Sequence, residues 1–319
     1  MGFFRNTMNN FYYGKSGKAD FTPESLPTSR MQLFWEMLRV RFSGLMRLNL
    51  LYAVAWLPAM ILLLLYALSA VTLLTQTENL AEAATQLKQT TSTTLLILFP
   101  CIAITGPFTA GISYVTRNWA RDEHAFIWGD FKDAVKSNWK QSLPVSAVTG
   151  LMPLLFWVCW NYYGSMSGAL GLILQALIFM VTAIASMMML YIHPMIVTYQ
   201  LSLKDILRNA LILSMAKAPQ SLGIRLLHCI PCIAAVVCYL YVSPIWTLLV
   251  IFLYYLFFGF GLSRFVTASF TNAVFDQYIN SKIEGAKVNR GLAEKTDDDD
   301  EDDEDEEDEE SASPERLTD

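Results

Sequence analysis

Two cysteines three residues apart are the first candidates for chemistry. The segment His228-Cys229-Ile230-Pro231-Cys232 has the C-x-x-C spacing of thiol–disulfide oxidoreductases. A redox cysteine needs thiolate character and solvent access, but both cysteines lie inside a long apolar stretch. Because a buried free cysteine behaves as a small hydrophobe, we expect both to be dispensable. A membrane redox protein that uses Cys229 and Cys232 remains an alternative.

The stretch 105–111, which reads TGPFTAG, is the most unusual part of any apolar run. Small residues and a proline can break a helix and expose backbone groups to a polar cavity. They can equally allow two helices to approach closely. A histidine in another run is more often a helix contact than a ligand. The residues that we assign to a cavity wall or a packing surface are Thr105, Gly106, Pro107, Thr109, Gly111 and His193.

Other signs of enzymatic chemistry are missing from the sequence. It contains no G-x-x-x-x-G-K-[ST], no H-E-x-x-H and no G-x-S-x-G. The loop residues Arg121, Asp122, Glu123 and His124 include metal-capable side chains, but a solvated charged face explains them better. We therefore expect a protein that is not an enzyme, with no cofactor, no metal and no nucleic-acid partner.

The elements that position these residues are long apolar runs. The chain has 319 residues, of which 54% are hydrophobic and 16% are charged, whereas an average domain has roughly 25% charged residues. Crossing a bilayer takes about 20 apolar residues. Runs of this kind occupy residues 48–74, 95–116, 142–163, 168–198, 221–242 and 240–263. They predict an all-α polytopic bundle of six transmembrane helices in a lipid bilayer, and none of them contains Asp or Glu.

The distribution of Lys and Arg predicts the orientation. Of the 23 Lys and Arg residues, all but Lys88 fall in segments that a six-span topology places on the same side as both termini. Positive residues concentrate in cytoplasmic loops. We therefore expect a multi-pass membrane protein with both termini in the cytoplasm.

A threefold internal repeat is one interpretation of the pattern. Amphipathic stretches at residues 31–46, 128–139 and 203–215 precede the odd-numbered spans and are typical of cytoplasmic helices in the headgroup layer. Each of these spans then contains a proline, and proline kinks a helix. The predicted kinks lie at Pro58, Pro153 and Pro231. Chance is the other interpretation, since proline is frequent in membrane helices.

The segments outside the spans complete the predicted organisation. Residues 1–47 form a cytoplasmic segment with an amphipathic helix, 48–263 the membrane domain, and 264–296 a cytoplasmic segment. Residues 297–319 form an acidic tail that begins with 14 consecutive acids and is predicted to be disordered. Without those acids the net charge of −6 becomes +8. A solvated tail or a site for a soluble basic partner are the two interpretations.

The chain resembles the YesL family of bacterial membrane proteins, whose biochemical activity is uncharacterised. The similarity rests on the opening MGFF, on RLNLL at 47–51 leading to Pro58, and on 105–141 with its TGPFTAG and YVTRNWAR segments. Association of family members with carbohydrate-uptake genes implies an accessory or permease-like role beside transporter subunits. The family implies no catalytic residues. A membrane scaffold or regulator, acting through the cytoplasmic helices and the acidic tail, is the alternative.

Overall fold

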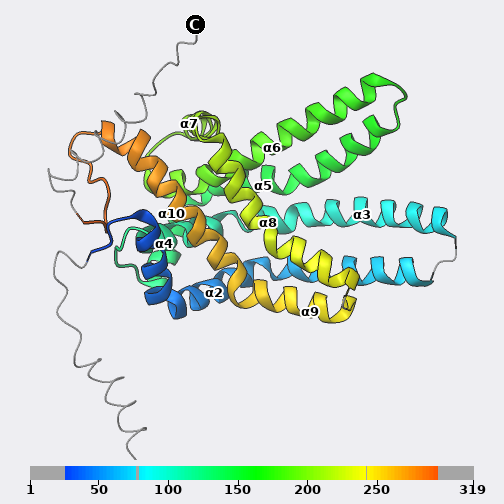
Figure 1. Ribbon diagram of the computed structural model, residues 1–319, viewed down its shortest axis with the longest axis horizontal. Coiled ribbons are helices and arrows are strands. Elements are labelled where there is room, and N and C mark those ends of the chain that lie inside the picture. The colour runs from blue at the N-terminus through cyan, green and yellow to red at the C-terminus, as the bar shows by residue number, and fades with distance from the viewer. Residues whose placement is uncertain (1–25, 77–78, 242, 294–319) are drawn as a thin grey trace, which may run out of the picture. The chain divides into compact units, whose positions relative to one another are not determined.

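The computed structural model describes residues 26–76, 79–241 and 243–293, which are helical and contain no strand (Figure 1). The predicted acidic tail, 297–319, lies outside the described residues. The described residues divide into two units, one made of 26–33 with 291–293 and the other lying within 34–290. In the smaller unit, the Ala293 amide donates to the Pro27 carbonyl at 3.0 Å. The larger unit contains the membrane helices.

Three helical hairpins make up most of the larger unit, and their return turns lie at the same end (Figure 1). They pair α2 with α3, α5 with α6, and α8 with α9. The elements are α2 (Arg30–Gln76), α3 (Leu80–Ala103), α4 (Gly106–Trp119), α5 (Ile127–Gly164), α6 (Ala169–Thr198), α7 (Leu203–Ala216), α8 (Ala218–Tyr241), α9 (Pro244–Tyr254), the π-helical turn η2 (Tyr255–Gly259), α10 (Phe260–Tyr278) and the 3₁₀ turn η3 (Asn280–Lys282).

Five helices in the described residues are long and apolar enough to cross a membrane, and six if a bent pair counts as one span. The bent pair is α3 with α4, whose axes differ by 55° at the break after Ala103. The predicted runs 48–74, 142–163, 168–198, 221–242 and 240–263 fall on the five continuous spans, and 95–116 falls on the bent pair. The prediction of an all-α, multi-pass membrane protein is confirmed.

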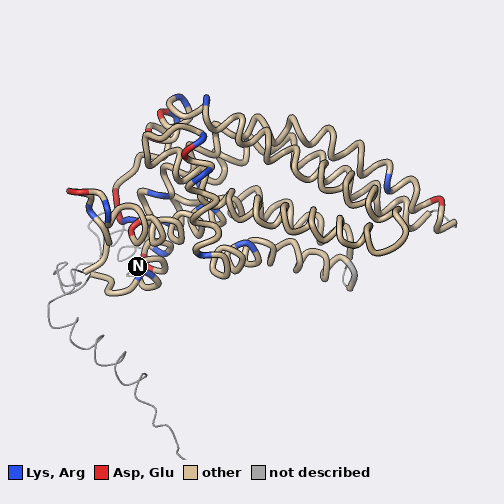
Figure 2. Tube along the Cα trace, turned by 90° about the horizontal axis from the view of Figure 1, so that it is seen from above, with Lys and Arg blue, Asp and Glu red and all other residues tan. Residues whose placement is uncertain are grey.

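Charged residues of the larger unit gather at the end opposite the hairpin turns (Figure 2). We call this region the charged end; it contains α4, α7 and the C-terminal half of α10. The parallel portions of the long helices carry few charges, as helices in a hydrocarbon layer must. Charged side chains of the larger unit are thus concentrated at one end, and the parallel helical segments are mainly apolar.

The three amphipathic stretches differ in their connection to the spans. The first two continue into the span without a break, as the N-terminal parts of α2 and α5. The third is the separate helix α7, which Ser202 caps and which ends at Lys217 before α8 begins. Ile206 and Ala210 on α7 are fully buried, whereas Leu207 and Leu211 are exposed. Half of this stripe therefore packs against protein, and half remains free to face headgroups.

Hydrogen bonds of Arg117, Asn118 and Asn272 link helices at the charged end. Arg117 on α4 donates to the Val197 carbonyl at 2.9 Å and to the Asn118 side chain at 2.7 Å. Asn272 on α10 donates to the Arg117 carbonyl at 3.3 Å. The Arg117 guanidinium also lies 4.9 Å from the centre of the Tyr114 ring. We call Arg117, Asn118, Val197 and Asn272 the Arg117 cluster; it joins α4, α6 and α10.

A second buried polar contact holds the π-helical turn. The fully buried Asn49 of α2 donates to the carbonyls of Tyr255 and Leu256, at 3.1 and 2.7 Å. Its side-chain oxygen accepts from the Gly261 amide at 2.7 Å. A π turn displaces backbone groups from the regular helical ladder, and such turns are frequent at functional sites. One amide side chain therefore bonds three backbone groups around this turn.

Candidate functional site

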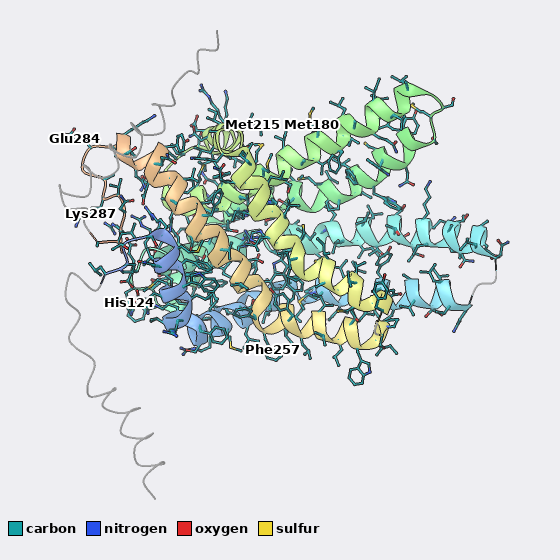
Figure 3. All side chains as sticks on the ribbon, in the orientation of Figure 1. His124, Met180, Met215, Phe257, Glu284 and Lys287 are labelled. Carbon is teal, nitrogen blue, oxygen red and sulfur yellow. The ribbon has the colours of Figure 1, made fainter. Side chains whose placement is uncertain are left out.

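A cavity of about 460 Å³ lies among the helices of the larger unit. Side chains from α2, α5, α6, α8, α10 and the π turn line it. This volume is within the range of small-molecule sites, roughly 300–1,000 Å³. Figure 3 shows the side chains that fill the space between these helices. The site therefore draws on helices from all three hairpins.

Four basic side chains line this cavity: His193, Arg225, His228 and Arg264. They come from α6, α8 and α10, and the two arginines lie within electrostatic range of each other and of both histidines. No Asp or Glu is among the described residues of the lining. We call these four residues the basic cluster; it is a concentration of positive charge without a carboxylate in its wall.

Several polar atoms of this lining lack a hydrogen-bond partner among the described residues. They are both ring nitrogens of His193, Nε of Arg225, Nε2 of His228 and the indole nitrogen of Trp56. His193 is only 4% exposed. Buried polar groups are nearly always hydrogen-bonded, so each exception calls for a water, an ion or a ligand. The unpartnered atoms are donors or histidine nitrogens, which suits a guest that accepts hydrogen bonds.

Aromatic rings form another wall of the cavity. Trp56 stacks on Phe260 with ring centres 5.1 Å apart, and Tyr255 lies 5.0 Å from Phe260. Tyr52 meets Phe260 edge-to-face at 5.7 Å. The π turn and the Asn49 contacts fix this wall, because Tyr255 begins the turn and Phe260 directly follows it. Rigid aromatic side chains beside placed polar groups are typical of ligand pockets.

Hydroxyl groups complete the polar lining. Thr149, Thr182 and Thr267 each donate to a carbonyl of their own helix, at 2.9, 2.8 and 2.8 Å. Their oxygens retain capacity to accept from water or from a ligand. Thr182 lies near the middle of α6, while His193 lies five residues before its end. The cavity therefore extends from the basic cluster toward the middle of the bilayer.

An apolar groove of about 400 Å³ adjoins the cavity. Trp56, Tyr255 and Phe260 line both spaces. The other residues of the groove come from α2, α8 and α9 and include Leu63 and Leu248. The aromatic wall thus separates a basic compartment from an apolar one.

Of the predicted cavity or packing residues, only His193 lines the cavity. The stretch 105–111 instead spans the α3–α4 break and packs against α5. A β-carbon on Gly106 would lie 2.4 Å from the Ser142 carbonyl oxygen, and one on Gly111 would lie 2.9 Å from Phe131 and Val135.

The hydroxyl groups of the same stretch serve local contacts. Thr105 donates to the Ile102 carbonyl at 2.8 Å, and Thr109 exchanges a hydrogen bond of 2.7 Å with Tyr52. Pro107 lies in the first turn of α4, where its missing amide proton costs nothing. The segment is a packing surface in this structure.

The helices continue through all three predicted kink residues. Pro153 lines the cavity, and Pro231 lines a separate apolar groove between α8 and α9. Cys229 and Cys232 are free on α8, and both are exposed, whereas the sequence predicts that they are buried. Cys232 lies 3.4 Å from the Tyr255 hydroxyl. Within the described residues, no group of three or more His, Cys, Asp or Glu side chains could hold a metal.

Sequence reasoning missed three members of the basic cluster. In the sequence, Arg225 lies one turn inside the run 221–242, His228 belongs to the C-x-x-C segment, and Arg264 directly follows the run 240–263. Each residue alone is unremarkable. The sequence does contain one signal: Arg225 and Arg264 lie at the ends of predicted spans, and the runs contain no Asp or Glu. Unpaired charges within a membrane are functional candidates by default.

Comparison with known proteins supports the family resemblance. No curated protein and no solved structure matches the chain. Residues 45–163, which run from the end of the first amphipathic stretch through α5, match the model of a family described as "Protein of unknown function, DUF624". The resemblance to the YesL family is thereby confirmed over this segment, which is similar to the YesL-type, DUF624 family of uncharacterised membrane proteins.

Proposed function

We propose that this protein is a permease-like component that admits a polar solute to the cavity within its membrane helices. The observation that supports this most is a cavity of about 460 Å³ with a basic, hydroxyl-rich lining inside an otherwise apolar bundle. A scaffold needs no such space, because a solid core would serve it better. Transport sites, in contrast, lie within the bundle and are lined by polar groups.

The orientation supports entry and exit on defined sides. With both termini in the cytoplasm of a bacterium, the charged end and the basic cluster face the cytoplasm, and the hairpin turns face outward. The lysine and arginine distribution favours this arrangement. The association of YesL-type proteins with carbohydrate-uptake genes favours an accessory or permease-like role in the uptake of sugars.

Side-specific thiol labelling tests the proposal. In a variant without the five native cysteines, Thr182→Cys places one thiol in the cavity. A permease-like protein should react with a membrane-impermeant methanethiosulfonate reagent both in intact cells and in inverted vesicles. Phe179→Cys is the matched control, since Phe179 is one turn away on α6 and 61% exposed toward lipid; it should react from neither side. Reaction of Thr182→Cys from the cytoplasmic side alone would contradict transport.

A scaffold or regulator is the second candidate. The exposed half of α7, including Leu207 and Leu211, is the observation that favours it. An apolar helix face beside Lys and Arg residues can dock a partner or the membrane surface. A detergent pull-down would separate the candidates: recovery of soluble regulatory proteins, lost on Leu207→Ser/Leu211→Ser, favours the scaffold, and recovery of transporter subunits favours the uptake role.

A further inference from the structure

We infer that the basic cluster is an anion-binding subsite, and that its ligand carries a carboxylate or a phosphate group held by Arg225 and Arg264. The inference deepens the proposed function by naming the class of ligand that the same cavity takes. The anion subsite depends on the charges of the cavity, whereas the labelling experiment tests access to the cavity. The permease-like function and the anion subsite can therefore be refuted independently.

Charge is the first argument. Arg225 and Arg264 each bring a guanidinium, which is a cationic group, to the cavity. Two like charges line one cavity in the described structure, with no carboxylate in the wall. Within the described residues, Glu123 forms ion pairs with Arg121 and Arg290, and none of these three side chains lines the cavity. Uncompensated charges in a membrane bundle are costly, and a bound anion would offset that cost.

Hydrogen-bonding capacity is the second argument. The buried His193 lines the cavity, and both of its ring nitrogens and Nε of Arg225 lack a partner among the described residues. A guanidinium offers planar, paired donors that match the oxygens of a carboxylate or a phosphate. Water could satisfy the donors but would leave both positive charges without a counter-charge. An oxyanion satisfies the donors and the charges together.

The shape of the surroundings admits two sources for this anion. An acidic sugar or another small soluble anion would fit a cavity of about 460 Å³ with aromatic and hydroxyl walls. An anionic lipid headgroup would also fit, with its acyl chains in the adjoining groove that shares Trp56, Tyr255 and Phe260. Both sources present the same chemistry to Arg225 and Arg264.

Thermal unfolding of the full-length protein tests the inference. The soluble arm compares glucuronate with the uncharged glucose, and inorganic phosphate with chloride at matched ionic strength, in neutral detergent. The lipid arm compares nanodiscs of phosphatidylglycerol with nanodiscs of phosphatidylcholine. We expect stabilisation by glucuronate, by phosphate or by phosphatidylglycerol relative to its comparison compound, and the arm that responds identifies the source.

Substitution locates the effect. Arg225→Gln and Arg264→Gln should each weaken the responding anion about tenfold to a hundredfold, as expected for loss of a charge-assisted hydrogen-bonding group. Arg208→Gln is the matched control, because Arg208 is exposed on α7 and does not line the cavity; it should keep the wild-type response. Arg→Lys at either site should retain part of the affinity. These lysine variants keep the test decisive if a glutamine variant fails to fold.

Two results would overturn the inference. One is the same unfolding temperature for wild-type protein in every charged and uncharged pair. The other is an anion response in Arg225→Gln and Arg264→Gln that equals the wild-type response, because the anion would then bind elsewhere. If an anion stabilises the protein but Thr182→Cys does not react from outside the cell, the anion subsite stands and the transport proposal is wrong. If Thr182→Cys reacts from both sides but no anion stabilises the protein, transport stands and the anion subsite is wrong.

Discussion

Arg117 and Arg225 are both partly buried arginines, but their surroundings differ. Arg117 donates to the Val197 carbonyl and to Asn118, and the Tyr114 ring covers its charge. Arg225 has an unpartnered Nε and faces a cavity that also contains Arg264. The first arginine is part of the packing that joins helices. The second has an Nε without a partner among the described residues, and we propose that its partner is a ligand in the cavity.

The difference extends to the regions around them. At the charged end, Arg117, Asn118 and Asn272 are hydrogen-bonded, and glycines allow close helix contact. Around the cavity, His193, Arg225, His228 and Trp56 each have a buried polar atom without a partner among the described residues. Substitutions at the charged end should therefore lower stability, while substitutions in the basic cluster should alter ligand response and leave stability nearly unchanged.

The largest loss of stability should follow Asn49→Ala. This change removes the partner of three backbone groups around the π turn, and a buried group left unpaired costs about 1–3 kcal/mol. Asn161→Ala is the control, because Asn161 bonds only the Trp157 carbonyl of its own helix. Thermal unfolding in detergent measures both. Equal unfolding temperatures for the two variants would show that the π turn does not need Asn49.

Replacing one arginine of each kind tests whether bonded and unbonded arginines differ in their contribution to stability. Arg117→Gln should destabilise the protein, since hydrogen bonds to charged groups are worth about 1.5–3 kcal/mol. Arg264→Gln should leave the unfolding temperature unchanged or raise it in anion-free buffer, because it removes one of two like charges. The same two proteins can be unfolded in parallel. A larger loss for Arg264→Gln than for Arg117→Gln would reverse the roles that we assign to them.

Gly106→Ala should cost about 1–3 kcal/mol of stability, the usual range for overpacking. The added carbon would lie 2.4 Å from the Ser142 carbonyl oxygen, so α4 and α5 must move apart. Gly223→Ala is the matched control, because a β-carbon there meets nothing within 4 Å. Alanine at position 223 should be neutral or stabilising by up to about 1 kcal/mol through helix propensity. Comparable unfolding temperatures of the two variants would argue against close packing at Gly106.

The smallest effect should follow deletion of residues 297–319. Contacts of the acidic tail with basic loops would be exposed, and such pairs contribute about 0–1 kcal/mol. We expect unchanged insertion and an unchanged unfolding temperature, with at most a changed affinity for a soluble partner. A large drop in the unfolding temperature that persists at high salt would assign the tail a structural role.

Much of the fold was predictable because hydrophobic runs report membrane helices directly. The runs from 48–74 to 240–263 each became a long helix or part of one. The break at 105 was signalled by its glycine and proline, but which of its two interpretations applied depended on whether α5 approached Gly106. That contact joins residues about 36 positions apart, and periodicity carries no information about it.

The basic cluster was less predictable for a related reason. His193, Arg225 and Arg264 come from three helices, and only their packing brings them to one cavity. The π turn beside them was also hidden, because nothing in the sequence of residues 255–259 separates a π turn from a regular apolar helix. A site assembled across helices appears in the sequence only as scattered charges.

The most direct test of the anion subsite is a cryo-EM map of the wild-type protein in nanodiscs, with the ligand that stabilises it. We predict density between Arg225 and Arg264 at hydrogen-bonding distance from both guanidinium groups, and no such density for Arg264→Gln under the same conditions. A cavity closed by side chains, or guanidinium groups turned to protein carbonyls with no density between them, would contradict the account.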